Sequence, residues 1–233
     1  MQKVLITGSN RGIGLGLVKQ ALENGDVVFA ACRNPEDASE LNALATQYSE
    51  QLHIIQLDVS DAASIKASAD AVKAHTDSLD VLINNAAVNP GAKASQLGDL
   101  DMDRITKILH INVTGPLMVT EAYYPLLKSG ETPRVVMMSS GMGSISGSTG
   151  GSYAYRMSKA AINMEAKSLA VDLKDDGIIV IAMDPGWVQT DMGGPSASIT
   201  VETSTSGQWN VINGLSVADT GGYRIYDGGH HEW

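Results

Sequence analysis

A short apolar strand, a glycine-rich turn and a helical segment follow one another at residues 4–24, and this order restricts the possible fold more than any other stretch of the chain. The turn reads Thr7-Gly8-Ser9-Asn10-Arg11-Gly12-Ile13-Gly14. Its three glycines let the backbone turn sharply and let a pyrophosphate approach the N–H groups at the positive end of the helix. The pattern predicts either a phosphate cradle or a plain tight connection.

Strand and helix patterns then alternate along the chain. Apolar strand patterns at 26–33, 53–57, 79–83, 134–138 and 178–183 are separated by segments with helical spacing. Repeated β-α units predict a parallel sheet with helices on both faces. A length of 233 residues with 43% hydrophobic content suits one core. We therefore expect a single α/β domain over residues 1–233, with a Rossmann-type, doubly wound parallel sheet.

Charge and cysteine content narrow the classes of partner and compartment. A net charge of -10 argues against nucleic acid or an anionic membrane as the main partner, since both need clustered Lys and Arg. Cys32 is the only cysteine, so no internal disulfide can form and a reducing compartment is expected. We find no signal-peptide pattern and no apolar run near ~18 residues. These features predict a soluble cytoplasmic protein that acts on a small molecule.

The end of the second strand distinguishes between two dinucleotides. An acidic residue there would bind the ribose 2′-hydroxyl of NAD, but Cys32 and Arg33 occupy the place. Together with Arg11 in the glycine turn, Arg33 can meet a 2′-phosphate with bidentate hydrogen bonds. The alternative is that both arginines are solvated surface charges. The composition of this strand end favours NADP(H).

Polar residues also follow the next two strands. Asp58 lies where ligands sit in such sheets, so it can contact adenine, or it can cap the next helix, as can Asp61. Asn84-Asn85-Ala86-Ala87 suits a strand end that bonds to neighbouring chain while leaving room for a flat ligand, although an ordinary loop has similar residues.

A tyrosine and a lysine stand four apart at the start of a helix predicted over 153–174. Tyr155 and Lys159 therefore share one helix face, where the ammonium favours phenolate and lowers the pKa of the phenol from ~10. Ser139 and Ser140 precede them at a strand end and can bind a substrate carbonyl. Asn112 lies in an apolar helical stretch, so it is either a satisfied core group or part of a site. An exposed Tyr/Lys pair and a Gly/Ser linker are the plain alternatives.

In order and approximate spacing, these motifs resemble the short-chain dehydrogenase/reductase family. The residues that carry the resemblance are Thr7-Gly8-x-x-x-Gly12-x-Gly14, Asp58, Asn84-Asn85-Ala86-Ala87, Asn112, Ser140, Tyr155-x-x-x-Lys159 and Asp184-Pro185-Gly186. The resemblance covers nearly the whole chain and is greatest to the carbonyl-reductase branch that includes sniffer and the bacterial C-factor. Two departures are Ala87, where the family usually has glycine, and a slightly long interval from Ser140 to Tyr155, which keeps Ser139 a candidate.

This resemblance implies NADPH-dependent reduction of an aldehyde or ketone by hydride transfer. Tyr155 would be the general acid, Lys159 would bind the nicotinamide ribose and lower the tyrosine pKa, Ser140 would orient the carbonyl, and Asn112 would position a water. It also implies a homodimer or homotetramer. The expected cofactor contacts are Gly8, Asn10, Arg11, Gly12, Ile13, Gly14, Arg33, Asp58, Val59, Asn85, Ala86, Ala87, Tyr155, Lys159, Pro185, Gly186, Val188 and Thr190.

Two further stretches carry expectations. We expect a substrate lid at about residues 192–212, whose first part is rich in Gly, Ser and Pro, although a passive loop has the same composition. His230-His231 lack a third ligand at suitable spacing, so we expect no metal. The alternative to a reductase is a signalling or regulatory protein that uses this fold to bind a dinucleotide with little turnover.

Overall fold

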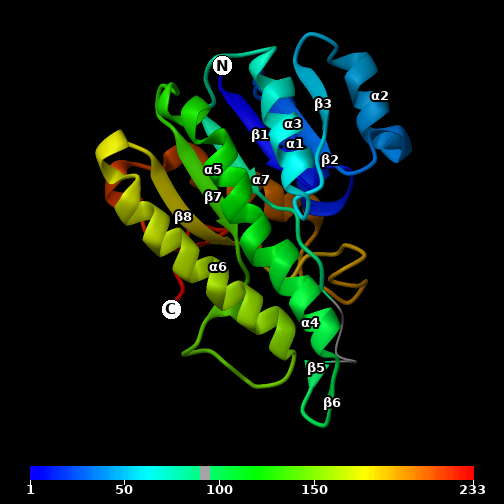
Figure 1. Cartoon of the computed structure of the whole chain (residues 1–233), viewed down its shortest axis with the longest axis vertical. Coiled ribbons are helices and arrows are strands. Elements are labelled where there is room, and N and C mark those ends of the chain that lie inside the picture. Colours follow the sequence, from blue (N-terminus) through cyan, green and yellow to red (C-terminus); the bar gives the residue numbers. More distant parts are fainter. Residues whose placement is uncertain (90–94) are drawn as a thin grey trace.

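One parallel β-sheet forms the centre of the molecule, whose computed structural model describes residues 1–89 and 95–233 (Figure 1). Its strands are β1 (Lys3–Thr7), β2 (Val27–Cys32), β3 (Leu52–Gln56), β4 (Val81–Asn84), β7 (Arg134–Met138), β8 (Ile179–Asp184) and β9 (Tyr223–Ile225). They lie in the order β3-β2-β1-β4-β7-β8-β9, with all neighbours parallel. The expected doubly wound, Rossmann-type α/β fold is confirmed. The order reverses between β1 and β4, and ligands bind at such a reversal.

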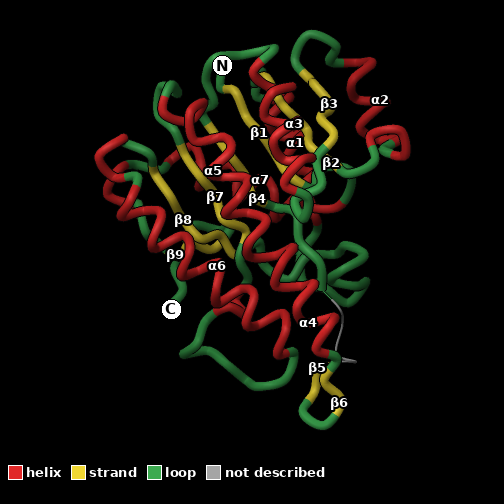
Figure 2. Tube along the Cα trace, in the orientation of Figure 1, coloured by secondary structure: helices red, strands yellow, loops and turns green. Residues whose placement is uncertain are grey.

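Helices cover both faces of the sheet (Figure 2). One core cluster joins the sheet to α1 (Gly12–Glu23), α2 (Ser39–Gln47) and α7 (Val201–Gly214), and the other joins it to α3 (Ala62–Lys73), α5 (Gly115–Lys128) and α6 (Tyr153–Asp172). α4 (Met102–Leu109) continues into α5 through a π-helical turn at His110–Thr114. The shorter elements are the hairpin β5 (Ser95–Gln96) with β6 (Asp99–Leu100) and 3₁₀ turns at Pro35–Asp37, Gly141–Gly143, Lys174–Asp176 and Val217–Asp219.

Burial on both faces explains the apolar runs in the sequence. Leu5 of β1 points into one core cluster, whereas its neighbours Val4 and Ile6 point into the other. Because successive strand residues face opposite sides, a sheet covered on both sides needs apolar residues at nearly every position. Within the described residues, no helix has both the length and the apolar character needed to span a bilayer.

The structure departs from the sequence pattern at several places, of which two have a clear physical reason. β9 is not predicted, because it has three residues and only Tyr223 is fully buried, so no alternation marks it. The helix predicted over 153–174 ends at Asp172, and a 3₁₀ turn carries the chain to Gly177. The φ of Gly177 is +71°, the left-handed conformation that ends a helix.

Candidate active site

A cleft of about 540 Å³ opens where the strand order reverses. It extends from Arg33, after β2, to Thr190, after β8. Many of the expected cofactor residues line it, namely Gly8, Asn10, Arg11, Gly12, Ile13, Gly14, Arg33, Asp58, Val59, Asn85, Ala86, Ala87 and Thr190. The described lining does not include Tyr155, Lys159, Pro185, Gly186 or Val188. It adds residues that are not among the expected cofactor contacts, namely Cys32, Glu40, Leu57, Val88, Ile111, Gln189, Asp191, Met192 and Val201.

The glycine turn leaves the first amides of α1 open to an anion. A Cβ on Gly14 would lie 2.3 Å from the carbonyl oxygen of Gly8, so only glycine fits there. The N-cap residue, Arg11, makes no side-chain cap in the described structure, and the first turn of α1 holds no acidic residue. These N–H groups at the positive end of the helix dipole therefore suit a pyrophosphate.

The end of β4 is fastened to this turn, as the asparagine pair predicts. The hydroxyl oxygen of Thr7 accepts hydrogen bonds from the backbone N–H groups of Asn85 and Ala86, both at 3.0 Å. The Asn85 amide donates to the carbonyl oxygens of Thr7 and Gly8 at 2.9 and 3.2 Å. Asn84 instead points into the core, where its amide donates to Thr120 Oγ1 at 2.9 Å. The bonds to Thr7 and Gly8 therefore fix Asn85 in the wall of the cleft and leave the cleft itself open.

Charged groups lie at both ends of the cleft. Burial opposes ionisation of Asp58, but hydrogen bonds from Ser60, with the charges of Arg33 and His110, hold the Asp58 pKa below its usual value. Arg11 forms an ion pair with Asp191 at 3.0 Å, and both side chains are largely exposed. In the described structure Arg33 thus lies near Asp58 at one end of the cleft, and Arg11 is bonded to the segment after β8.

Tyr155 and Lys159 lie one above the other on α6, as their spacing predicts. The Lys159 Nζ lies 5.5 Å from the centroid of the Tyr155 ring and donates to the Met138 carbonyl oxygen at 2.7 Å. The Ser140 side chain lies beside the Tyr155 phenol, where its hydrogen-bonding effect lowers the pKa of the phenol. Ser139 is turned away: its hydroxyl donates to Asn163 Oδ1 at 2.5 Å inside the core. Of the two serines, Ser140 is therefore the one beside the phenol.

The expected lowering of the tyrosine pKa is wrong for the protein alone. Burial raises the pKa of Tyr155 to about 12; the Ser140 hydrogen bond lowers it, while Asp184 and Tyr223 raise it further. Burial also lowers the pKa of Lys159 to about 8, against the opposing effect of Asp184. The four-residue spacing predicts an ammonium close to the phenol, but the fold buries both groups and desolvation dominates.

Asn112 is a fully bonded group in the π-helical turn between α4 and α5. Its Oδ1 accepts from the backbone N–H of Val88 at 2.8 Å, and its Nδ2 donates to the Val88 carbonyl oxygen at 2.8 Å and to Ser158 Oγ at 3.2 Å. Val88 lines the cleft, and Ser158 precedes Lys159 on α6. Asn112 therefore connects the cleft wall to the helix that carries the Tyr/Lys pair.

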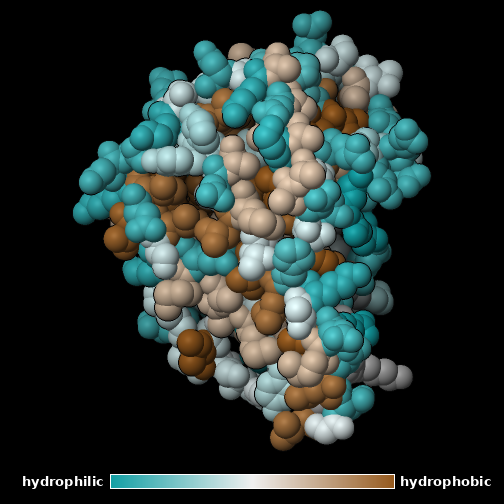
Figure 3. Space-filling view, in the orientation of Figure 1, coloured by the Kyte–Doolittle hydropathy of each residue, from teal (hydrophilic) through white to brown (hydrophobic). Residues whose placement is uncertain are grey.

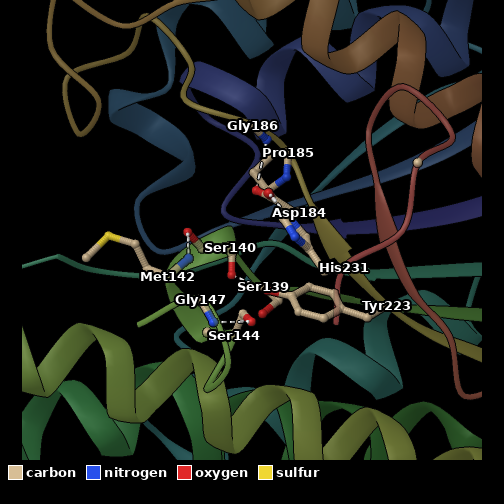
Figure 4. A network of polar contacts seen from close by, with 12 residues as sticks. Ser139, Ser140, Met142, Ser144, Gly147, Asp184, Pro185, Gly186, Tyr223 and His231 are labelled. Carbon is tan, nitrogen blue, oxygen red and sulfur yellow. Dashed lines mark hydrogen bonds and ion pairs between the residues drawn. The ribbon is translucent and has the colours of Figure 1, made fainter. Parts of the chain in front are cut away.

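The two histidines near the end of the chain have different surroundings. His230 is exposed and contacts the Arg224 guanidinium, whereas His231 Nε2 lies 2.6 Å from Asp184 Oδ2 (Figure 4). Among the residues that the structure describes, no three His, Cys, Asp or Glu side chains gather as a metal site. The Asp184–His231 contact joins residues far apart in sequence, and no local motif predicts it.

The fold and the cleft define a class, the doubly wound α/β proteins with a ligand cleft at the switch point of a parallel sheet. The model of the short chain dehydrogenase family matches residues 2–198. The chain belongs to the short-chain dehydrogenase family.

Three known proteins illustrate the similarity. The carbonyl reductase Sniffer of D. melanogaster is 38% identical, with a TM-score of 0.95 and full coverage of both chains. An NADPH-bound carbonyl reductase from chicken fatty liver is 35% identical, with a TM-score of 0.92, over 100% of this chain and 99% of that one. The C-signal protein of Myxococcus xanthus is 44% identical over 159 residues, which are 68% of this chain and 95% of that protein. The expected family and its carbonyl-reductase branch are confirmed.

Proposed function

We propose that the protein is an NADPH-dependent carbonyl reductase in which Tyr155 protonates the oxygen of an aldehyde or ketone. The observation that carries the proposal is the position of Tyr155 between two groups: Lys159 Nζ lies 5.5 Å from its ring centroid, and the Ser140 side chain lies beside its phenol. A carbonyl oxygen placed between the Tyr155 and Ser140 hydroxyls can accept from both, which orients it and supplies its proton. The nicotinamide would supply the hydride when bound.

The residues of the cleft fit a dinucleotide with a 2′-phosphate. The uncapped amides at the start of α1 are suited to the pyrophosphate, and Arg33 stands at the end of β2 where a carboxylate would select NAD. Glu40 also lines the cleft, but Lys19 pairs with it at 3.3 Å. The neighbour from chicken fatty liver is NADPH-bound, which supports the same cofactor here.

Lys159 has a defined role in this proposal. Its Nζ is held by the Met138 carbonyl oxygen, 2.7 Å away, which leaves its other N–H groups to donate to a ribose hydroxyl. Pro185, Gly186 and Val188 would form the nicotinamide side of the site together with Thr190. Residues 192–212 are proposed as the substrate lid region; α7 takes up residues from 201 onward and packs on α1.

The test follows nicotinamide absorbance with NADPH and NADH in parallel, against aldehydes, aryl ketones, diketones and quinones. We expect consumption with NADPH preferred, and Tyr155→Phe should lower turnover about 100-fold or more while NADPH affinity stays near that of the unaltered protein. Tyr153→Phe, on the same helix, is the matched control and should retain activity. Retained turnover in Tyr155→Phe would refute the acid assignment.

The two serines provide a second comparison. Ser140→Ala removes the hydroxyl that lies beside the Tyr155 phenol, whereas Ser139→Ala removes one that bonds to Asn163 in the core. We expect Ser140→Ala to lower kcat more, and Ser139→Ala to lower thermal stability more. The reverse order of kcat effects would transfer the carbonyl-orienting role to Ser139.

A second candidate is a dinucleotide-binding signalling or regulatory protein of the same fold. The similarity to C-signal favours it, because 44% identity extends over almost the whole of that protein. Under this alternative, NADPH binds but no carbonyl consumes it, and Tyr155→Phe leaves the biological effect unchanged. The absorbance assay and a fluorescence titration of NADPH together decide between the two functions.

We also propose that the chain assembles as a homodimer or homotetramer through α5 and α6. Met157, Met164 and Val171 follow one stripe of α6 and are 44%, 66% and 70% exposed. Figure 3 shows apolar side chains on the face that carries these helices. Met164→Asp should lower the mass measured by light scattering, whereas the control Val217→Asp, an exposed apolar residue outside α5 and α6, should not. A monomeric wild-type chain would rule out this assembly.

A further inference from the structure

A carboxylate and an imidazole form a pair against the Ser140 turn, outside the cleft lining (Figure 4). Asp184 ends β8; its Oδ1 accepts from the Gly186 N–H at 3.0 Å, and its Oδ2 lies 2.6 Å from His231 Nε2. A carboxylate only accepts hydrogen bonds, so the imidazole donates. A Cβ on Gly141 would lie 3.2 Å from Asp184 Oδ2 and 3.4 Å from the His231 ring. The pair therefore packs directly on the residue that follows Ser140.

Neighbouring residues bond to the same turn. The Tyr223 hydroxyl donates to the Ser140 carbonyl oxygen, and its ring lies 4.8 Å from the His231 ring, centroid to centroid. Ser144 Oγ donates to the Glu232 carbonyl oxygen at 2.8 Å. The backbone N–H of Ser146 donates to the carbonyl oxygen of Trp233 at 3.2 Å. Residues 231–233 and Tyr223 are thus attached along the whole segment 140–146.

Asp184 also acts on the Tyr155–Lys159 pair through its charge. The titratable groups that face this carboxylate are Tyr155 and Lys159 from α6, Tyr223 from β9 and His231. Burial is the main cause of the raised pKa of Tyr155, and the Asp184 charge adds to it; the same charge opposes the lowering of the Lys159 pKa. A change at Asp184 is therefore transmitted to the phenol.

We propose that His231 is a positioning residue for carbonyl reduction: it holds Asp184 against the Ser140 turn and, by donating to the carboxylate, limits the negative field at Tyr155. The effect on turnover rests on the proposed function. The effect on the turn does not, so it can be measured in the protein without a substrate. His230 supplies a matched control, because it is adjacent in sequence but contacts Arg224 instead.

The first test measures alcohol oxidation with NADP⁺ against pH, because oxidation needs ionised Tyr155 and its rate rises through that pKa. His231→Ala leaves the Asp184 charge without its donor, so the rise should move to higher pH by about 0.5–1 unit. Asp184→Asn removes the charge and should move it to lower pH. His231→Gln, whose amide can still donate, and His230→Ala should leave it unchanged. If the pH at which the oxidation rate rises moves in the same direction in His231→Ala and in Asp184→Asn, the electrostatic role is overturned.

The second test uses hydrogen exchange of the segment 139–148, followed by mass spectrometry. His231→Ala should exchange about tenfold faster there, while His231→Gln and His230→Ala exchange like the wild type. If the wild-type protein reduces no carbonyl but His231→Ala still exchanges faster in this segment, the proposed function is refuted and the holding role of His231 is supported. Normal turnover with an unchanged pH profile and unchanged exchange in His231→Ala would overturn this inference alone.

Discussion

Replacing Asn112 with alanine should destabilise the protein by leaving two backbone polar groups of one residue, Val88, without their partner. The Asn112 amide satisfies both the N–H and the C=O of Val88, and the side chain is 1% exposed. Each unsatisfied backbone group costs about 1–3 kcal/mol, and the lower end applies because Val88 is only half-buried. Ser158 loses little, since its hydroxyl still donates to the Tyr155 carbonyl oxygen at 2.8 Å. The expected loss is therefore about 2–3 kcal/mol.

Thermal unfolding measures this loss, because 1 kcal/mol moves Tm by about 2–4 °C in a chain of this size. Asn112→Ala should lower Tm by about 4–12 °C. Asn42→Ala is the matched control: its exposed amide makes one bond, to the Pro35 carbonyl oxygen, and its loss should cost under about 0.5 kcal/mol. If both variants unfold at the same temperature, the bonds to Val88 contribute no net stability and the reasoning fails.

Three other changes have defined outcomes. Arg33→Ala should weaken NADPH binding about 10–100-fold and NADH binding little, by fluorescence titration; equal weakening would mean that Arg33 does not meet the 2′-phosphate. Burial raises the pKa of Glu165 from 4.5 to about 8, so its folded form loses stability as pH rises between these values. Glu165→Gln should then raise the free energy of unfolding by about 1–2 kcal/mol at pH 9 and little at pH 5, in denaturant titrations. Gly14→Ala forces backbone atoms together and should cost about 1–3 kcal/mol with loss of NADPH binding, whereas Gly214→Ala, where a Cβ meets nothing, should not destabilise.

The cleft could be predicted because its chemistry is local in sequence. Strand, glycine turn and helix are adjacent in the chain, and the clash that excludes a side chain at Gly14 comes from Gly8, only six positions earlier. The Asn84-Asn85 pattern predicts hydrogen bonds to neighbouring chain, and parallel topology brings the end of β4 to the edge where Thr7 is the partner. Local backbone requirements and a regular fold together specify this part of the site.

The other part of the site depends on contacts between distant residues. His231 meets Asp184 only because β9, a strand too short to leave an apolar pattern, pairs with β8 and directs residues 230–233 toward the Ser140 turn. Arg11 meets Asp191 only because the segment after β8 passes the glycine turn. Periodicity and spacing relate only residues that are a few turns apart in the sequence. The Asp184–His231 and Arg11–Asp191 contacts therefore have no sequence signal.

The tyrosine shows how burial changes the direction of an effect that spacing predicts. Four-residue spacing places Lys159 beside Tyr155, but its Nζ is bonded to the Met138 carbonyl oxygen and buried, so desolvation of the phenol outweighs attraction to the ammonium. With a pKa of about 12, the phenol is almost entirely protonated at pH 7. A protonated phenol is the form that donates to a carbonyl oxygen, whereas alcohol oxidation needs the phenolate. In the proposed reaction, the buried tyrosine is therefore set for reduction, and the reverse reaction should gain more from each rise in pH.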